Sequence, residues 1–138
     1  MDTKEFMREI AAEKRFFSNL SLDNIVLDGL NLERLELVNA SMEGASLFMT
    51  NLKGSRMEGV NLDMANLERA NLMLANLAKS SFVKSNMTDV VMACTNLSGA
   101  RIVDSDMSYA DLRGAELKGA TLTRVNMQGA DLRLFVLD

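Results

Sequence analysis

The side chains in this 138-residue sequence that could do chemistry are its hydroxyls, its carboxylates, its lysines and one cysteine, Cys94. Histidine is absent, so no imidazole can serve as a general base, activate a serine or bind zinc. A single cysteine cannot form an internal disulfide, and Cys94 has no resolving cysteine to support a redox role. We therefore expect no catalytic residue, no metal site and no cofactor, and predict that the protein is not an enzyme.

The length is that of one domain, and a composition of 48% apolar and 25% charged residues is typical of a soluble globular chain. A net charge of −4 disfavours direct binding to nucleic acid, which depends on basic side chains. No apolar run is long enough to span a bilayer, and Asp2, Lys4 and Glu5 stand where a signal peptide would need apolar residues. We expect a cytoplasmic protein that contacts neither nucleic acid nor membrane.

The sequence repeats every five residues. From Leu22, each step of five reaches a large apolar residue, without a slip, as far as Leu137. Two residues before each large residue stands a small or β-branched one, from Ala40 to Ala130. The position between these two columns is mostly Asn or Asp, and the last position of the unit is frequently Gly. A period of five fits neither a helix nor a simple strand, so the repeat itself has to define the fold.

Within each unit, the small and the large residue are two positions apart and therefore point to the same side of a short extended segment. The Asn or Asp between them points outward. A glycine with positive φ suits the third position of a type II turn, which would bend the chain at the end of each unit. Short segments joined by corners must coil, and we expect the coils to stack about 4.8 Å apart around the two inward columns.

Several units carry the pattern almost unaltered, for example Ala65-Asn66-Leu67, Ala70-Asn71-Leu72 and Ala110-Asp111-Leu112. They resemble the pentapeptide-repeat family, whose motif is written A-[DN]-L-x-x. The resemblance covers about residues 20 to 137. It implies an all-β protein, a right-handed quadrilateral β-helix with four pentapeptides in each coil and about six coils in all, and it assigns residues 20–138 to this solenoid.

The segment before the repeats predicts a cap, because an open solenoid exposes its core at its ends. Residues 2 to about 16 contain good helix formers, with Phe6, Ile10 and Ala11 on one side. We therefore assign residues 1–19 to a capping α-helix and the segment that leads into the repeats. In the first coil the small column holds large residues, which would close the core under the helix: Leu20, Ile25, Leu30 and Leu35.

The other end of the repeats carries apolar residues at outward positions. Phe135 occupies a small-residue position, and Leu134 and Val136 should face outward. Either these residues plug the last coil, or they form an end-to-end homodimer contact, as the resemblance implies, because many family members dimerise through C-terminal coils. We favour the homodimer, since exposed apolar clusters usually mark contacts.

Outward apolar residues also gather around the third of the four faces. The middle of this candidate partner face carries Val91, and its borders carry Phe48 and Met49 on one side and Met73, Leu74 and Cys94 on the other. Methionine is common at adaptable binding surfaces, so the first hypothesis is a rigid, non-enzymatic module that binds an unidentified protein partner. The alternative is that these are ordinary, scattered surface residues without a function.

A second hypothesis rests on charge. Residues 21 to 70 hold eight carboxylates against four basic side chains, and Asp23, Glu43 and Asp63 should stack in one column, a repulsive arrangement that stability alone would not favour. The quinolone-resistance pentapeptide proteins are similar in repeat and resemble an acidic DNA duplex that engages DNA gyrase. The column could imitate a phosphate edge in the same way, or it could be a solvated acidic rim. A purely structural role or a role as a secreted effector is also open, because the repeat itself does not specify a function.

Overall fold

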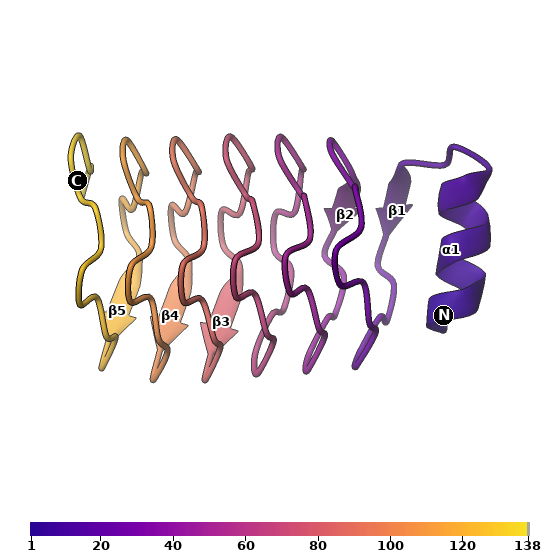
Figure 1. Cartoon of the computed structure of the whole chain (residues 1–138), viewed down its shortest axis with the longest axis horizontal. Coiled ribbons are helices and arrows are strands. Elements are labelled where there is room, and N and C mark those ends of the chain that lie inside the picture. Colours follow the sequence, from indigo (N-terminus) through magenta and orange to yellow (C-terminus); the bar gives the residue numbers. More distant parts are fainter. Residues whose placement is uncertain (138) are drawn as a thin grey trace.

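The five-residue repeat closes into a coil once every 20 residues. A computed structural model describes residues 1–137 and shows a stack of such coils with one helix across its end (Figure 1). Residue 138, the last of the segment assigned to the solenoid, lies outside the described residues. The strands pair in parallel between residues 20 apart, as in the partners Phe17 and Leu37, and the isolated bridges, such as Asn31 to Asn51, keep the same interval. Four pentapeptides therefore complete each coil, as predicted.

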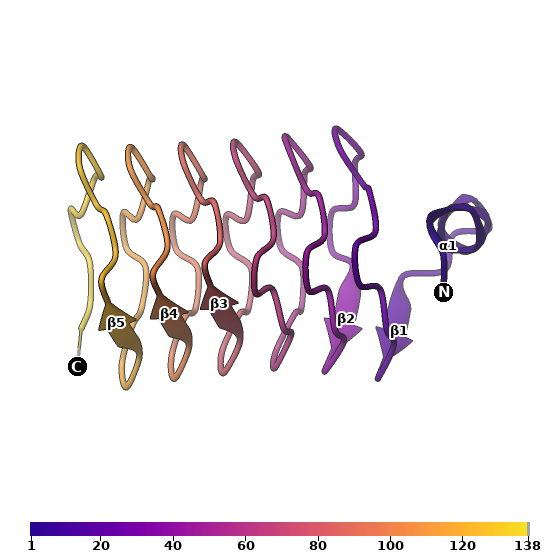
Figure 2. The same ribbon diagram turned by 90° about the horizontal axis from the view of Figure 1, so that it is seen from below.

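The regular elements are short. They comprise α1 (Thr3–Ala11), β1 (Phe16–Ser18), β2 (Glu36–Val38), β3 (Ser81–Val83), β4 (Arg101–Val103) and β5 (Thr121–Thr123). β1 pairs with β2, and β3, β4 and β5 form a second parallel sheet on another side of the rod (Figures 1 and 2). No helix within residues 1–137 has the length and apolar character needed to cross a membrane.

The coils are joined by a continuous ladder of backbone hydrogen bonds. The N–H of each large core residue donates to a carbonyl 19 residues later, as Leu62 does to Ser81 at 2.8 Å. The N–H of the polar residue before it donates to a carbonyl 21 residues earlier, as Asn61 does to Ala40 at 3.0 Å. Because both bonds run along the rod axis, each unit is held by the coils on its two sides.

Every fifth residue from Asn19 to Leu134 has a positive φ angle and forms a corner. Most corners are closed by a bond from the next residue of the small column, such as Ala45 N–H to the Met42 carbonyl at 3.0 Å. The prediction of glycine at such corners is confirmed for Gly29 and its equivalents. Side chains as large as that of Leu74 adopt the same left-handed conformation, because the ladder outweighs its cost of about 1–2 kcal/mol for each residue.

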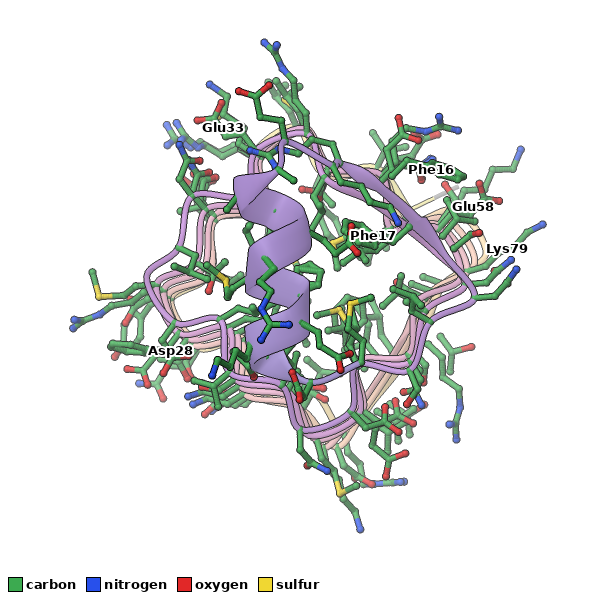
Figure 3. All side chains as sticks on the ribbon, turned by 90° about the vertical axis from the view of Figure 1, so that its right-hand side faces the viewer. Phe16, Phe17, Asp28, Glu33, Glu58 and Lys79 are labelled. Atoms are coloured by element: carbon green, nitrogen blue, oxygen red, sulfur yellow. The ribbon has the colours of Figure 1, made fainter. Side chains whose placement is uncertain are left out.

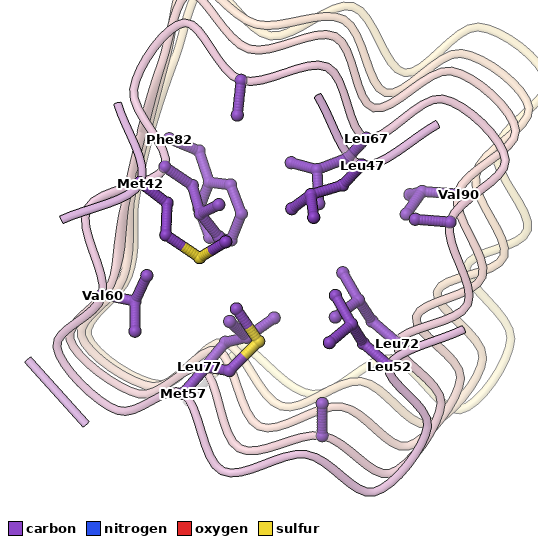
Figure 4. Close-up of a cluster of buried hydrophobic side chains, with 14 of the residues drawn as sticks. Met42, Leu47, Leu52, Met57, Val60, Leu67, Leu72, Leu77, Phe82 and Val90 are labelled. Atoms are coloured by element: carbon purple, nitrogen blue, oxygen red, sulfur yellow. The ribbon is translucent and has the colours of Figure 1, made fainter. Parts of the chain in front are cut away.

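The core is the predicted column of large residues. Side chains from one coil, including Met42, Leu47, Leu52 and Met57, point to the centre of the rod (Figure 4). From Leu22 to Leu117 these residues are almost fully buried. Residues of the small column, such as Val60, line the same interior (Figure 4). The burial of this column supplies the main stabilisation of the rod.

Helix α1 covers one end of the core (Figure 3). Asp2 caps it by accepting a hydrogen bond from the Glu5 N–H at 2.8 Å, and Phe6 and Ile10 are buried beneath it. The Phe6 ring lies 4.9 Å from that of Phe17, centroid to centroid. Of the bulky first-coil residues expected to close the core, Ile25 and Leu35 are buried, and Leu20 and Leu30 pack partly buried against the core.

The helix is shorter than the expected span of residues 2–16, and Ala11 is exposed instead of lying on its buried side. The chain leaves the helix after Ala11 because β1 already pairs with β2 from residue 16 onward. The ladder thus includes residues 16–18, which lie before the segment assigned to the solenoid from its sequence.

Two buried serines in the small column provide a matched stability test. The Ser85 hydroxyl donates to the Leu62 carbonyl at 2.8 Å, whereas the Ser55 Oγ is buried without a partner among the described residues. We predict that Ser85→Ala lowers the free energy of unfolding by about 1 kcal/mol, and that Ser55→Ala leaves it unchanged or raises it. Urea denaturation of both variants measures the difference; equal losses would contradict the assignment.

Candidate interaction surfaces

One part of the predicted partner face is a contiguous group on a single corner. Met73 and Leu74 form this corner in one coil, and Ala93 and Cys94 form it in the next. The Leu74 N–H donates to the Ala93 carbonyl at 3.1 Å, so the two coils are in direct contact here. Leu74 is 58% exposed, Cys94 is exposed and Met73 is half-buried, whereas Ala93 is buried. We call Met73, Leu74 and Cys94 the corner cluster.

The remaining members of the predicted face lie on its other border and in its middle. Phe48 and Met49 form the preceding corner of their coil, on the corner where Figure 3 labels Asp28. Met49 is 53% exposed, but Phe48 is half-buried, and its N–H donates to the Asp28 carboxylate at 3.1 Å. Val91 is half-buried in the middle of the face between the two corners. The structure therefore places the six residues on two separate corners and the strip between them.

Two of the three residues in the predicted acidic column accept hydrogen bonds from the next coil. Asp23 accepts hydrogen bonds from the Ser41 hydroxyl and from the Glu43 N–H at 3.0 Å, both in the next coil. Asp63 likewise accepts from the Ser81 hydroxyl at 2.6 Å and from the following corner N–H of residue 83 at 2.9 Å. Asp23 and Asp63 thus have a structural role that the sequence did not reveal, because each one bridges two coils.

The residue between the small and the large column of each unit explains why Asp23 and Asp63 form these bridges. Where it is Asn or Asp, its own side chain accepts from the N–H two residues later, as Asn61 does from Asp63 at 2.9 Å. Where it is Ser41 or Ser81, the shorter side chain donates instead, and an aspartate from the preceding coil serves as acceptor. The carboxylate of Glu43 makes no hydrogen bond within residues 1–137, so it is the free acid of the column.

The last described coil exposes apolar side chains. Leu134 is 84% exposed and Val136 is 42% exposed, as expected for outward positions, whereas Phe135 is half-buried against the core. Sequence reasoning missed three further residues here, Leu122, Leu132 and Leu137, because it assigned them to the buried column. No coil covers them within residues 1–137, and the only sequence signal was their position at the end of the column.

Ion pairs lie beside this exposed end. Arg133 donates to both carboxylate oxygens of Asp131, with an Nη2–Oδ2 distance of 2.6 Å. This bonding lowers the pKa of Asp131 to about 2. Arg113 pairs in the same way with Asp111 at 2.7 Å and lowers the pKa of that carboxyl. Both arginine charges are therefore compensated locally.

The comparisons with known proteins agree with this geometry. The model for pentapeptide repeats matches residues 37–72, 70–108 and 103–137, and the chain therefore belongs to the pentapeptide-repeat family. No curated protein sequence gives a significant match.

The solved structures that resemble this chain have low sequence identity to it. The chain is 19% identical to Rfr23, a pentapeptide-repeat protein of the cyanobacterium Cyanothece 51142, with a TM-score of 0.46 and coverage of 98% of this chain and 99% of that one. It is 24% identical to a pentapeptide-repeat protein of the Arabidopsis thaliana thylakoid lumen, with a TM-score of 0.44 and coverage of 74% and 64%. A trypsin-treated R167E form of QnrB1, a plasmid-mediated fluoroquinolone resistance protein, is 16% identical, with a TM-score of 0.50 and coverage of 86% and 74%.

The bridging role of the aspartates can be tested within the acidic column itself. We predict that Asp63→Ala lowers the free energy of unfolding by about 1 kcal/mol, because the Ser81 hydroxyl and a corner N–H lose their acceptor. Glu43→Ala removes the same charge from the neighbouring coil and should leave stability within about 0.5 kcal/mol. Urea denaturation distinguishes the two; an equal effect would show that column charge, not bridging, governs stability.

Proposed function

We propose that this protein is a rigid, non-enzymatic interaction module that binds another protein through the corner cluster. The observation that carries the proposal is the contact between the Leu74 corner and the Cys94 corner, which joins exposed apolar side chains from two successive coils. Gly54 and Gly114 occupy the same corner in the coils on either side, so these two positions place no side chain of their own beside the cluster. Exposed apolar groups of this kind are common at protein contacts.

The solenoid suits this role because it fixes the spacing of its surface residues. We take the rod to be a right-handed quadrilateral helix of about six coils, in line with its family. Its hydrogen-bond ladder holds successive coils about 4.8 Å apart, so a partner meets side chains that need little ordering on binding. Met73 adds an adaptable surface beside the more rigid Leu74.

The test is capture of a partner from native lysate on the immobilised protein. We predict that the double variant Met73→Glu/Leu74→Glu retains its thermal stability but reduces the captured partner at least about tenfold, because charges replace apolar contact. Met64→Glu is the matched control, since Met64 is 53% exposed on a different corner. If the native protein, the double variant and Met64→Glu capture equal amounts of partner, the corner cluster is not the binding site.

Mimicry of DNA towards gyrase is the second candidate. The fold is shared with a fluoroquinolone resistance protein, and Asp23, Glu43 and Asp63 do stack in successive coils. A supercoiling assay with gyrase tests this with the triple variant Asp23→Asn/Glu43→Gln/Asp63→Asn, which removes the charge but keeps side-chain acceptors. Mimicry predicts that the native protein alters supercoiling and that the triple variant does not; no effect of the native protein would reject it.

The exposed last coil supports a further proposal, in which a second copy docks end to end. Leu132, Leu134, Val136 and Leu137 would bury their apolar surface in such a homodimer. We predict a dimer mass by sedimentation equilibrium for the native chain and a monomer mass for Leu134→Glu. A native chain that stays monomeric at high micromolar concentration would contradict this arrangement.

A further inference from the structure

Basic side chains lie near the same corner in the coils between the corner cluster and α1. We call this column of equivalent corner positions the corner line. Lys53 occupies the position equivalent to Met73 in the preceding coil. Arg34 occupies the position equivalent to Leu74 two coils earlier, with Gly54 between them. Arg34 and Lys53 are exposed, and neither forms an ion pair within residues 1–137.

The side chain of Arg34 leans towards the next coil, where Gly54 occupies the same corner. A β-carbon built at Gly54 would lie 3.6 Å from the Arg34 Cγ, so the base of the arginine side chain lies beside this glycine, in the coil before Leu74. Glu33 occupies the position equivalent to Lys53 in the coil before it, and its carboxylate accepts a hydrogen bond from the Asn51 side chain at 2.9 Å. The α1 side of the line therefore carries two basic groups and one acid.

The two sides of the cluster therefore differ in charge. On the far side, Arg113 and Arg133 occupy the same corner line, but each is paired with an aspartate on its own unit. Within residues 1–137, the basic side chains of the corner line that lack an ion-pair partner lie only on the α1 side of the cluster. Unpaired positive charge is therefore distributed unevenly along the corner line.

From this arrangement we propose that the corner cluster binds an amphipathic α-helix of a partner protein, with carboxylates placed one turn from its apolar residues. The inference rests on the proposed function, because it names the partner chemistry of the same corner. A helix rises 5.4 Å per turn and the coils are about 4.8 Å apart, so a helix lying along the corner line presents one turn to each coil. Its carboxylates face Lys53 and Arg34, and its apolar residues cover Leu74 and Cys94.

A designed helical peptide tests this directly. The probe is a lactam-stapled peptide of about 14 residues, with leucines on one face and two glutamates one turn before them, labelled for fluorescence polarisation. Its matched partner carries lysines in place of the two glutamates. We expect the acidic peptide to bind at least about tenfold more tightly than the basic one at low salt, and the difference to shrink as salt is added.

Variants of the protein locate the contact. Lys53→Glu and Leu74→Glu should each lower the affinity for the acidic peptide at least about tenfold. Arg69→Glu, a charge reversal at an exposed position on another corner, should leave that affinity unchanged. Equal binding of both peptides, no binding of the acidic peptide, or an equal loss with Arg69→Glu would overturn the inference.

The same variants separate this inference from the proposed function. In the lysate assay, loss of the captured partner with Leu74→Glu but not with Lys53→Glu or Arg34→Glu would leave the corner cluster as the binding site and reject an acidic helix as its ligand. Loss with all three would support both proposals.

Discussion

Parallel backbone pairing at an interval of 20 residues determines where every side chain of this rod lies. It places each residue directly between the residues 20 positions before and after it. Core residues such as Leu62 and Phe82, which follow one another in successive coils, therefore lie in one column, and so do the outward residues of each corner. A contact surface on this rod is thus formed along columns, not along the chain.

The corners show how the same pairing accommodates different residues. A left-handed conformation is unfavourable for most side chains, yet Met49, Leu74 and Cys94 all adopt it. The ladder on either side fixes the backbone and offsets the unfavourable conformation at each corner. The result is that large apolar side chains can be presented at corners, where they reach furthest from the rod axis.

The sequence predicted the core columns and the capping helix, because these features repeat with a fixed period or have a helical pattern. The coil of four units followed from the resemblance to the pentapeptide-repeat family, not from the period itself. The sequence did not predict the bridges of Asp23 and Asp63, because a repeat shows which residues are neighbours but not which side chains bond. It placed Phe48 and Leu74 on opposite borders of one face, and these residues occupy the two corners that bound that face. The period did not show that Phe48 is half-buried. The exposure of Leu132 depends on the absence of a covering coil among the described residues, which a periodic pattern cannot encode.

The contact between coils that defines the corner cluster is tested most directly by a cross-link between Cys94 and a cysteine introduced by Leu74→Cys. The 20-residue register places the two α-carbons about 4.8 Å apart, within the range of a disulfide. Mild oxidation should give an intramolecular disulfide in the monomer, seen by mass spectrometry after digestion, whereas Met49→Cys, on the other corner, should give none with Cys94. Formation of the bond with Met49→Cys, or its absence with Leu74→Cys, would contradict the 20-residue register.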